Sequence, residues 1–209
     1  MSALQRIAYY QDRRDEVPNQ ELAKELTAQK DRKGIREIAD NLWNKNAQVQ
    51  SDCLKVLYEI GYLQPELVAP YVEDFLKLLH SRKNRLVWGA MIALSTVADL
   101  KADVIYPHVE EIEQVMDRGS VITQDNGVKV LALVAAQKAA YSRTIFPYLL
   151  HHLETCRPKD VPQHAEKAAV AVNARNKQPF ISVLEKRLVD LSGSQAARVK
   201  KVIKQVEQL

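Results

Sequence analysis

Two histidines and a cysteine come closest to a metal-binding pattern in this sequence. His152 and Cys156 are four positions apart, so on a helix their side chains would lie one turn apart on the same face. Zinc sites take three or four protein ligands, and the next histidine, His164, is separated from this pair by a segment that contains Pro158 and Pro162. We therefore expect surface histidines and a half-buried thiol here, and no bound metal.

Catalytic motifs are missing from the sequence. It contains no phosphate-binding G-x-x-x-x-G-K-[ST] loop, no G-x-S-x-G serine, no H-E-x-x-H zinc motif and no C-x-x-C pair. We therefore name no catalytic residue and no cofactor. The sequence favours a binding protein over an enzyme.

The best candidates for a binding surface are five residues on predicted helices, at positions turned away from the apolar stripes. They are Lys55, Tyr58, Trp88, Asp125 and Lys129. Trp88 leads this set because Trp, Tyr and Arg are enriched among the residues that dominate binding energy, and three basic residues lie just before it in the sequence. The alternative is that Trp88 packs against the edge of a neighbouring helix or a capping segment.

An apolar stripe that repeats along the chain predicts the helices that carry these residues. The first copy begins at Val49 and has apolar or small residues at i, i+4, i+7, i+8 and i+11, which form one face of an α-helix. A shift of 37 residues gives a second copy from Leu86, and a further shift of 37 gives a third from Thr123. Each copy predicts an amphipathic helix.

Prolines provide a second repeating signal at a similar interval. Pro70, Pro107, Pro147 and Pro179 are separated by 37, 40 and 32 positions, and each is followed within two positions by an apolar residue. Because proline is tolerated best in the first turn of a helix, each of them predicts a helix start. The two signals together predict helical hairpins, which bury their stripes only by stacking on one another.

These hairpins resemble the HEAT repeat of the armadillo-like superfamily. The resemblance rests on the helix-opening proline and, about 15 residues later, a Val-x-x-x-small-x-x-apolar-Leu-x-x-apolar-Gly helix, and it covers about residues 31–209. The sequence departs from the HEAT pattern early in the second helix, where Gln50, Val87 and Gln124 replace a basic residue, and it lacks a regular aspartate in the turn. The resemblance implies an all-α fold, a right-handed solenoid (α-α superhelix) of stacked hairpins whose second helices line a concave face.

We expect a single domain over residues 1–209, because a repeat protein has one continuous core. Its predicted parts are N-terminal capping helices over 1–30, repeats over 31–69, 70–106, 107–146 and 147–178, and a C-terminal partial repeat over 179–209.

The net charge of +4 is unevenly distributed along the chain. Residues 1–128 hold 16 Lys and Arg against 20 Asp and Glu, whereas residues 129–209 hold 14 against 6. A basic end favours an acidic partner or nucleic acid. The alternative is an unevenly charged surface that is only solvated.

The sequence therefore predicts a non-catalytic scaffold that binds a protein or peptide on its concave face. The alternative is nucleic-acid binding through the basic C-terminal region, with an activity similar to that of HEAT-like alkylpurine DNA glycosylases, although none of their catalytic residues can be matched here. No segment approaches the ~20 apolar residues that span a bilayer, so no membrane partner is expected. Two distant cysteines and a polar N-terminal segment predict a cytoplasmic protein.

Overall fold

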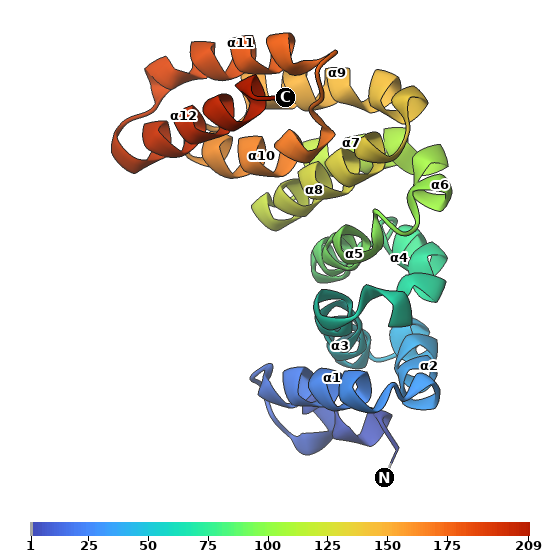
Figure 1. Cartoon of the computed structure of the whole chain (residues 1–209). Helices are drawn as coiled ribbons and strands as arrows, with labels where there is room; N and C mark the ends of the chain where they lie inside the picture. The colour runs from blue at the N-terminus through green and yellow to red at the C-terminus, as the bar shows by residue number, and fades with distance from the viewer. Residues whose placement is uncertain (1) are drawn as a thin grey trace. The chain divides into compact units, whose positions relative to one another are not determined.

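Helices are the only regular elements among residues 2–209, the part of the chain that the computed structural model describes. Figure 1 shows them following one another as hairpins along the chain. The all-α class predicted from the sequence is therefore confirmed. The chain divides into two compact units, Met1–Asn126 and Gly127–Leu209.

Two rows of helices form most of the N-terminal unit (Figure 1). The first row contains α1 (Val17–Gln29), α3 (Ala47–Leu63) and α5 (Asn84–Val97), and α3 packs against both of the others. In the second row, α2 (Arg32–Asp40) packs against α3, and α4 (Val72–Leu78) packs against α5. The helices α2 and α3 form one hairpin, and α4 and α5 form the next.

The three predicted copies of the apolar stripe lie on α3, α5 and α8 (Val121–Gln137), so the prediction of these helices is confirmed. Between α5 and α8 the chain forms α6 (Ala102–Ile105) and α7 (Val109–Arg118). The stripe residues are core residues, as shown by Cys53 and Ile60 of α3, which have no exposed surface.

Side-chain caps explain where two of these helices begin. The Asn46 carboxamide oxygen accepts hydrogen bonds from the backbone N–H groups of Gln48, at 2.8 Å, and Val49 at the start of α3. Asp31 caps α2 in the same way by accepting from Lys33 and Gly34. Each cap pairs N–H groups that have no partner within the helix.

Three of the four prolines mark helix starts as predicted, and Pro179 does so in the first turn of the helix Lys177–Arg187. Pro70 lies in a 3₁₀ turn immediately before α4, and Pro107 lies in a 3₁₀ turn immediately before α7. The third proline does not, because Pro147 lies inside α9 (Ala139–Thr155). The prediction of a helix start at Pro147 is therefore wrong.

The position of Pro147 has a physical cost that other contacts must offset. Proline has no N–H to donate to the carbonyl four residues earlier, which here belongs to Arg143. The helix is held instead by tertiary packing: α9 packs against α11 (Lys177–Arg187), and Phe146 contacts Phe180 with ring centroids 6.3 Å apart. Both phenylalanines are buried.

The C-terminal unit continues from α8 with two more hairpins. The first consists of α9 and α10 (Val161–Ala168), and the second consists of α11 and α12 (Gly193–Glu207). In this unit α9 packs against α11, and α10 packs against α12. The segment 179–209 therefore contributes most of one complete hairpin.

A buried arginine joins the two hairpins of this unit. The Arg187 guanidinium donates to the backbone carbonyls of Leu153 (2.6 Å), Glu154 (2.8 Å) and Cys156 (2.8 Å) at the end of α9. It also pairs with Asp190 at 2.8 Å. Because the last carbonyls of a helix lack partners within it, a cation placed there stabilises the helix end.

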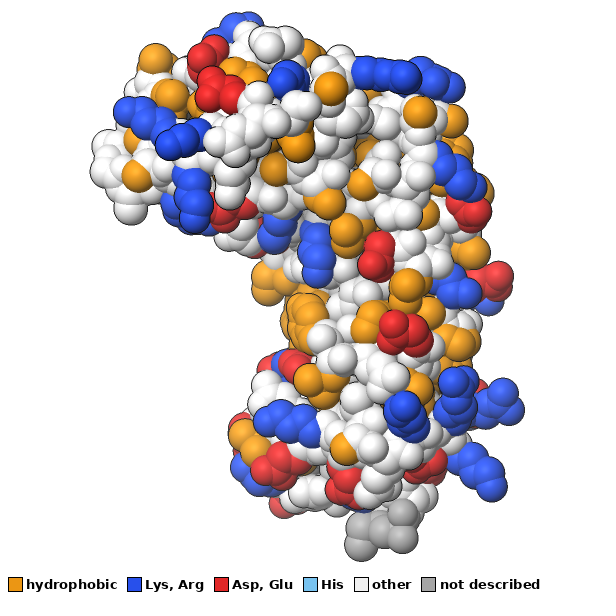
Figure 2. All heavy atoms as spheres, in the orientation of Figure 1, with side chains coloured by type: hydrophobic (Ala, Val, Ile, Leu, Met, Phe, Trp, Pro, Cys, Tyr) orange, Lys and Arg blue, Asp and Glu red, His pale blue; other side chains and the backbone are white. Residues whose placement is uncertain are grey.

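The uneven charge follows the division into units. Gly127 and Val128 are uncharged, so the N-terminal unit holds 16 basic and 20 acidic residues and the C-terminal unit holds 14 and 6. Figure 2 shows Lys and Arg side chains gathered on the surface over α12. Not all of them are free, because Arg198 forms a two-pronged ion pair with Glu166 at 2.8 and 2.7 Å.

Candidate functional site

Lys55 lies in the first row of helices, where its charge is paired on both sides. Its residue surface is only 7% exposed, and its ammonium group contacts the carboxylates of Glu16 at 2.8 Å and Glu59 at 2.7 Å. Burial lowers the pKa of Lys55, but the hydrogen bonds to Glu16 and Glu59 outweigh that effect and hold the pKa above its usual value. Lys55 is therefore a fixed cation.

Tyr58 lies beside Lys55 on α3 and is also buried. The Lys55 ammonium is 4.8 Å from the centre of the Tyr58 ring, within cation–π range. Burial raises the pKa of the Tyr58 hydroxyl, and Lys55 partly opposes that rise. The neighbouring Tyr62 ring meets the Tyr58 ring edge-on, and Tyr62 is 53% exposed, so the aromatic pair reaches the surface through Tyr62.

Lys55 and Tyr58 are buried because α3 packs against other helices on several sides: α1 and α5 in its own row and α2 in the second row. A helix with neighbours in its own row and in the second row presents only a narrow strip to solvent. The same effect buries the whole run 91–98 in and just after α5. The helical frame, which placed Lys55 and Tyr58 away from the apolar stripe, could not show how close the next helix lies.

Trp88 lies on α5 and is half-buried. The guanidinium carbon of Arg85 is 6.0 Å from the centre of the Trp88 ring, at the limit of a cation–π contact. The Arg85 side chain is 55% exposed, and its contact with Glu16 is long, at 3.5 Å. Glu16 therefore bridges the buried Lys55 and the exposed Arg85.

A hollow of about 320 Å³ opens beside this bridge. Residues from the N-terminal segment that precedes α1, from α3 and from the start of α5 line it. Its charged side chains are four basic ones and three acidic ones: Arg13, Arg14, Lys83, Arg85, Asp15, Glu16 and Asp52. Asp52 lies at its base, with its carboxylate accepting the Tyr9 N–H at 2.9 Å. Burial raises the pKa of Asp52, and the Tyr9 hydrogen bond partly offsets the rise.

The two remaining predicted residues lie on α8 and are both half-buried. Asp125 belongs to the N-terminal unit and Lys129 to the C-terminal unit. Each of them interacts with a neighbour. The structure thus brings Lys55 and Tyr58 together, with Trp88 linked to Lys55 through Arg85 and Glu16, and it leaves the role of Asp125 and Lys129 as a prediction.

Sequence reasoning missed two participants in this site. Glu16 and Glu59 pair with Lys55, and Glu59 could have been found from its i,i+4 spacing to Lys55. Glu16 carries no such signal, because it reaches α3 from another element. The other tryptophan of this unit, Trp43, is 51% exposed and donates its indole N–H to Asp74 at 3.3 Å.

The structure also brings together the histidines and the cysteine that the sequence appeared to separate. His164 lies on α10, and its ring nitrogen is 3.0 Å from a ring nitrogen of His152. His152, Cys156 and His164 form a group of metal-ligating side chains. The reason given for excluding a third ligand is therefore wrong, because residues 157–160 form a tight turn that leads directly into α10.

Comparisons with known proteins identify the architecture. No protein-family model and no curated protein sequence matches the chain. Among solved structures, an engineered protein is similar with a TM-score of 0.70 and 16% identity, over 100% of this chain and 98% of the other. A designed armadillo repeat protein is similar with a TM-score of 0.65 and 13% identity, over 98% of each chain. Another, described as computationally designed for modular peptide recognition, has a TM-score of 0.62 and 14% identity, over 97% of each.

At these identities the similarity shows the fold and leaves the ligand open. It offers no support for a nucleic-acid partner. Among the described residues, no helix is both long and apolar enough to cross a bilayer. The hairpins and the similar structures agree, and the chain has the fold of the armadillo/HEAT-like superfamily of helical repeat proteins.

Proposed function

We propose that the protein is a non-catalytic scaffold that binds an extended peptide or protein segment on the first row of the N-terminal unit, around Lys55, Tyr58 and Trp88. The observation that carries the proposal is the Arg85–Trp88 pair, in which Arg85 also lines the hollow. A similar solved structure is described as designed for modular peptide recognition, which supports this use of the fold.

The geometry favours a segment that presents a carboxylate next to an apolar side chain. Arg85 is exposed and only loosely held by Glu16, so an incoming carboxylate would gain a two-pronged contact with its guanidinium at little cost. The half-buried Trp88 ring offers apolar area beside it. Lys55, which is fully paired and buried, would fix the position of Glu16 and would contact the segment little.

This division of roles distinguishes the five predicted residues. Trp88 would be the principal contact, while Lys55 and Tyr58 would hold the surface in shape. Asp125, at the start of α8, would flank the segment as predicted from its place one repeat beyond Trp88. Lys129 belongs to the C-terminal unit, and the proposal does not use it.

The test is selection from a displayed random-peptide library against the full chain, followed by fluorescence anisotropy with a selected peptide. We expect Trp88→Ala to weaken binding by about 30-fold, which corresponds to ~2 kcal/mol. Arg85→Gln should weaken acidic peptides specifically, and wild-type affinity for them should fall as salt is raised because the contact is exposed.

Trp43→Ala is the matched control, since it removes an exposed tryptophan of the same unit that contacts Asp74 and not Arg85. It should leave the affinity unchanged. Equal weakening by both tryptophan variants would place the binding surface elsewhere. Failure to enrich any peptide would remove the proposed function.

A further inference from the structure

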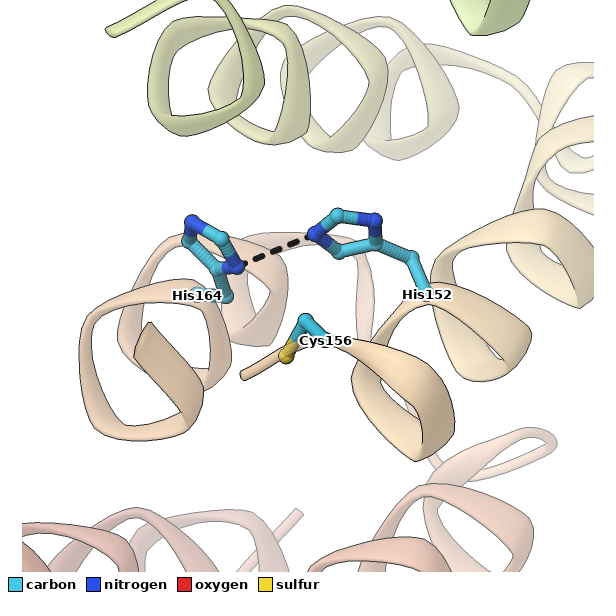
Figure 3. A group of neighbouring side chains, drawn as sticks. All are labelled: His152, Cys156 and His164. Atoms are coloured by element: carbon cyan, nitrogen blue, oxygen red, sulfur yellow. Dashed lines mark hydrogen bonds between the residues drawn. The ribbon is translucent and has the colours of Figure 1, made fainter. Parts of the chain in front are cut away.

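The histidine and cysteine cluster of the C-terminal unit has the composition of a transition-metal site. His152 and Cys156 lie at the end of α9, and His164 lies on α10. One ligand atom from each residue lies within 4.8 Å of the other two. Figure 3 shows the two imidazole rings meeting between α9 and α10, with Cys156 beside them.

The backbone around the cluster is held in place from three directions. The Cys156 N–H donates to the His152 carbonyl at 2.8 Å, which closes the last turn of α9. Arg187 reaches from α11 to the Cys156 carbonyl at 2.8 Å. The turn 157–160 leads into α10, which has Pro162 in its first turn. The ligands are therefore positioned before any ion binds, which reduces the entropic cost of binding.

The burial of His164 is difficult to explain by packing alone. Its residue surface is 0% exposed, and histidine is usually only partly buried in proteins. Its Nδ1 lies 3.0 Å from Nε2 of His152, and the ring centroids are 4.9 Å apart. Because a hydrogen bond needs one donor and one acceptor, at least one of these two nitrogens carries a lone pair directed into the cluster.

The distances suit a tetrahedral ion after small movements. With Zn–N bonds of about 2.0–2.1 Å and a Zn–S bond of about 2.3 Å, tetrahedral ligand atoms are roughly 3.3–3.6 Å apart. The two nitrogens here are slightly closer than that, and all three atoms lie within 4.8 Å of one another. Rotation of the half-buried His152 and Cys156 side chains about their own bonds could supply the adjustment.

We propose that His152, Cys156 and His164 bind one Zn²⁺ ion, with water as the fourth ligand. Two imidazoles and a thiolate are a ligand set that Zn²⁺ prefers over Mg²⁺ or Ca²⁺. For both imidazoles to bind the metal, the proton shared between His152 Nε2 and His164 Nδ1 must leave, either to another ring nitrogen or to solvent. The Cys156 thiol must also lose its proton to become a thiolate. This proposal concerns the C-terminal unit and does not rest on peptide binding.

Burial raises the pKa of the Cys156 thiol, and the neighbouring Arg187 guanidinium partly opposes that rise. The Cys156 Sγ lies 3.8 Å from the Leu153 carbonyl oxygen. Because a metal binds the thiolate form of cysteine, metal uptake should release protons, which is a measurable property of the site.

The experiment uses the full chain without a polyhistidine tag, first stripped with a chelator and then incubated with Zn²⁺ or Co²⁺. After desalting, we expect wild type to retain about one equivalent of Zn²⁺ by elemental analysis. Co²⁺ should give the absorption of a tetrahedral ion together with a sulfur-to-cobalt charge-transfer band. Zn²⁺ should also raise the midpoint of thermal unfolding.

Cys156→Ser should abolish the charge-transfer band, and His152→Ala should abolish stoichiometric retention of both metals. His152 is half-buried, so its replacement tests the ligand without depending on the fully buried His164. The matched control is His151→Ala, which changes the adjacent, exposed histidine outside the cluster and should retain one equivalent.

Two results would overturn the proposal. One is that stripped wild type retains neither Zn²⁺ nor Co²⁺ while its circular dichroism shows an intact fold. The other is that His152→Ala and Cys156→Ser retain as much metal as wild type, which would assign the ion to other residues.

Discussion

A close approach between α3 and α5 at Gly61 makes Gly61→Ala an informative substitution. A Cβ atom added at Gly61 would lie 2.2 Å from Oγ1 and 2.8 Å from Cβ of Thr96 on α5. Both distances are far below normal van der Waals contact. The same substitution in an unobstructed helix interior would stabilise the protein by about 0.5–1 kcal/mol, because alanine has the higher helix propensity.

Thr96 cannot easily give way. Its hydroxyl donates to the Ala93 carbonyl at 2.7 Å, and rotating it would break that bond at a cost of about 1 kcal/mol. Rotation would not move the Thr96 Cβ, which is fixed by the backbone, so α3 and α5 would have to separate. Overpacking of this kind costs about 1–3 kcal/mol. After the gain in propensity is subtracted, we expect Gly61→Ala to lower the free energy of unfolding by about 1–2 kcal/mol.

Tryptophan fluorescence during urea unfolding measures this effect in the relevant unit, because the two tryptophans of the chain, Trp43 and Trp88, both lie in Met1–Asn126. The control is the same substitution in a Thr96→Ala background, which removes the hydroxyl and the methyl group from the contact. The cost of Gly61→Ala should then fall by at least ~0.5 kcal/mol, as expected for residues in contact. A Gly61→Ala protein as stable as wild type, or more stable, would refute the close approach of α3 and α5.

Two further predictions concern other parts of the chain. Arg187→Lys should lower the stability of the C-terminal unit by about 1–3 kcal/mol, because a single ammonium cannot reach the three carbonyls that the guanidinium binds. Circular dichroism should report that loss while the tryptophan transition stays unchanged, and a shift of both transitions would contradict the local role of Arg187. For Asp52, burial raises the pKa in the folded state, so its contribution to stability is greatest at low pH and is lost as pH rises through the folded pKa. The free energy of unfolding of Asp52→Asn, minus that of wild type, should therefore increase as pH rises from about 4 to about 6. If that difference stays constant over this range, burial does not destabilise the Asp52 carboxylate.

Much of the fold could be predicted because its signals are local. The stripe that begins at Val49 and recurs from Leu86 and Thr123 requires only that apolar residues share one face of a helix, and α3, α5 and α8 form where it predicts. Caps such as Asn46 act within one turn and define helix starts in the same local way.

The prolines show the limit of that reasoning. Pro70 and Pro107 precede helices, but Pro147 lies inside one. The residue type permits both arrangements, and packing of α9 against α11 decides between them. No pattern within the segment around Pro147 contains that information.

The candidate sites show the same limit: their positions on helices could be predicted, but their surroundings could not. Lys55, Tyr58 and Trp88 were found from the helical frame, yet their exposure depends on neighbours that the frame does not include. The proximity of His164 to His152 and Cys156 depends on the angle at which α10 leaves the turn after α9.

The sequence by itself determined the helical class, the hairpin interval and the face of each helix on which a residue lies, because these follow from the periodicity of neighbouring residues. Only the tertiary structure decided which of those faces are covered, how Glu16 reaches Lys55 and which three side chains meet between α9 and α10. Contacts between separate helices depend on distances and angles in space that the spacing of residues along the chain does not encode.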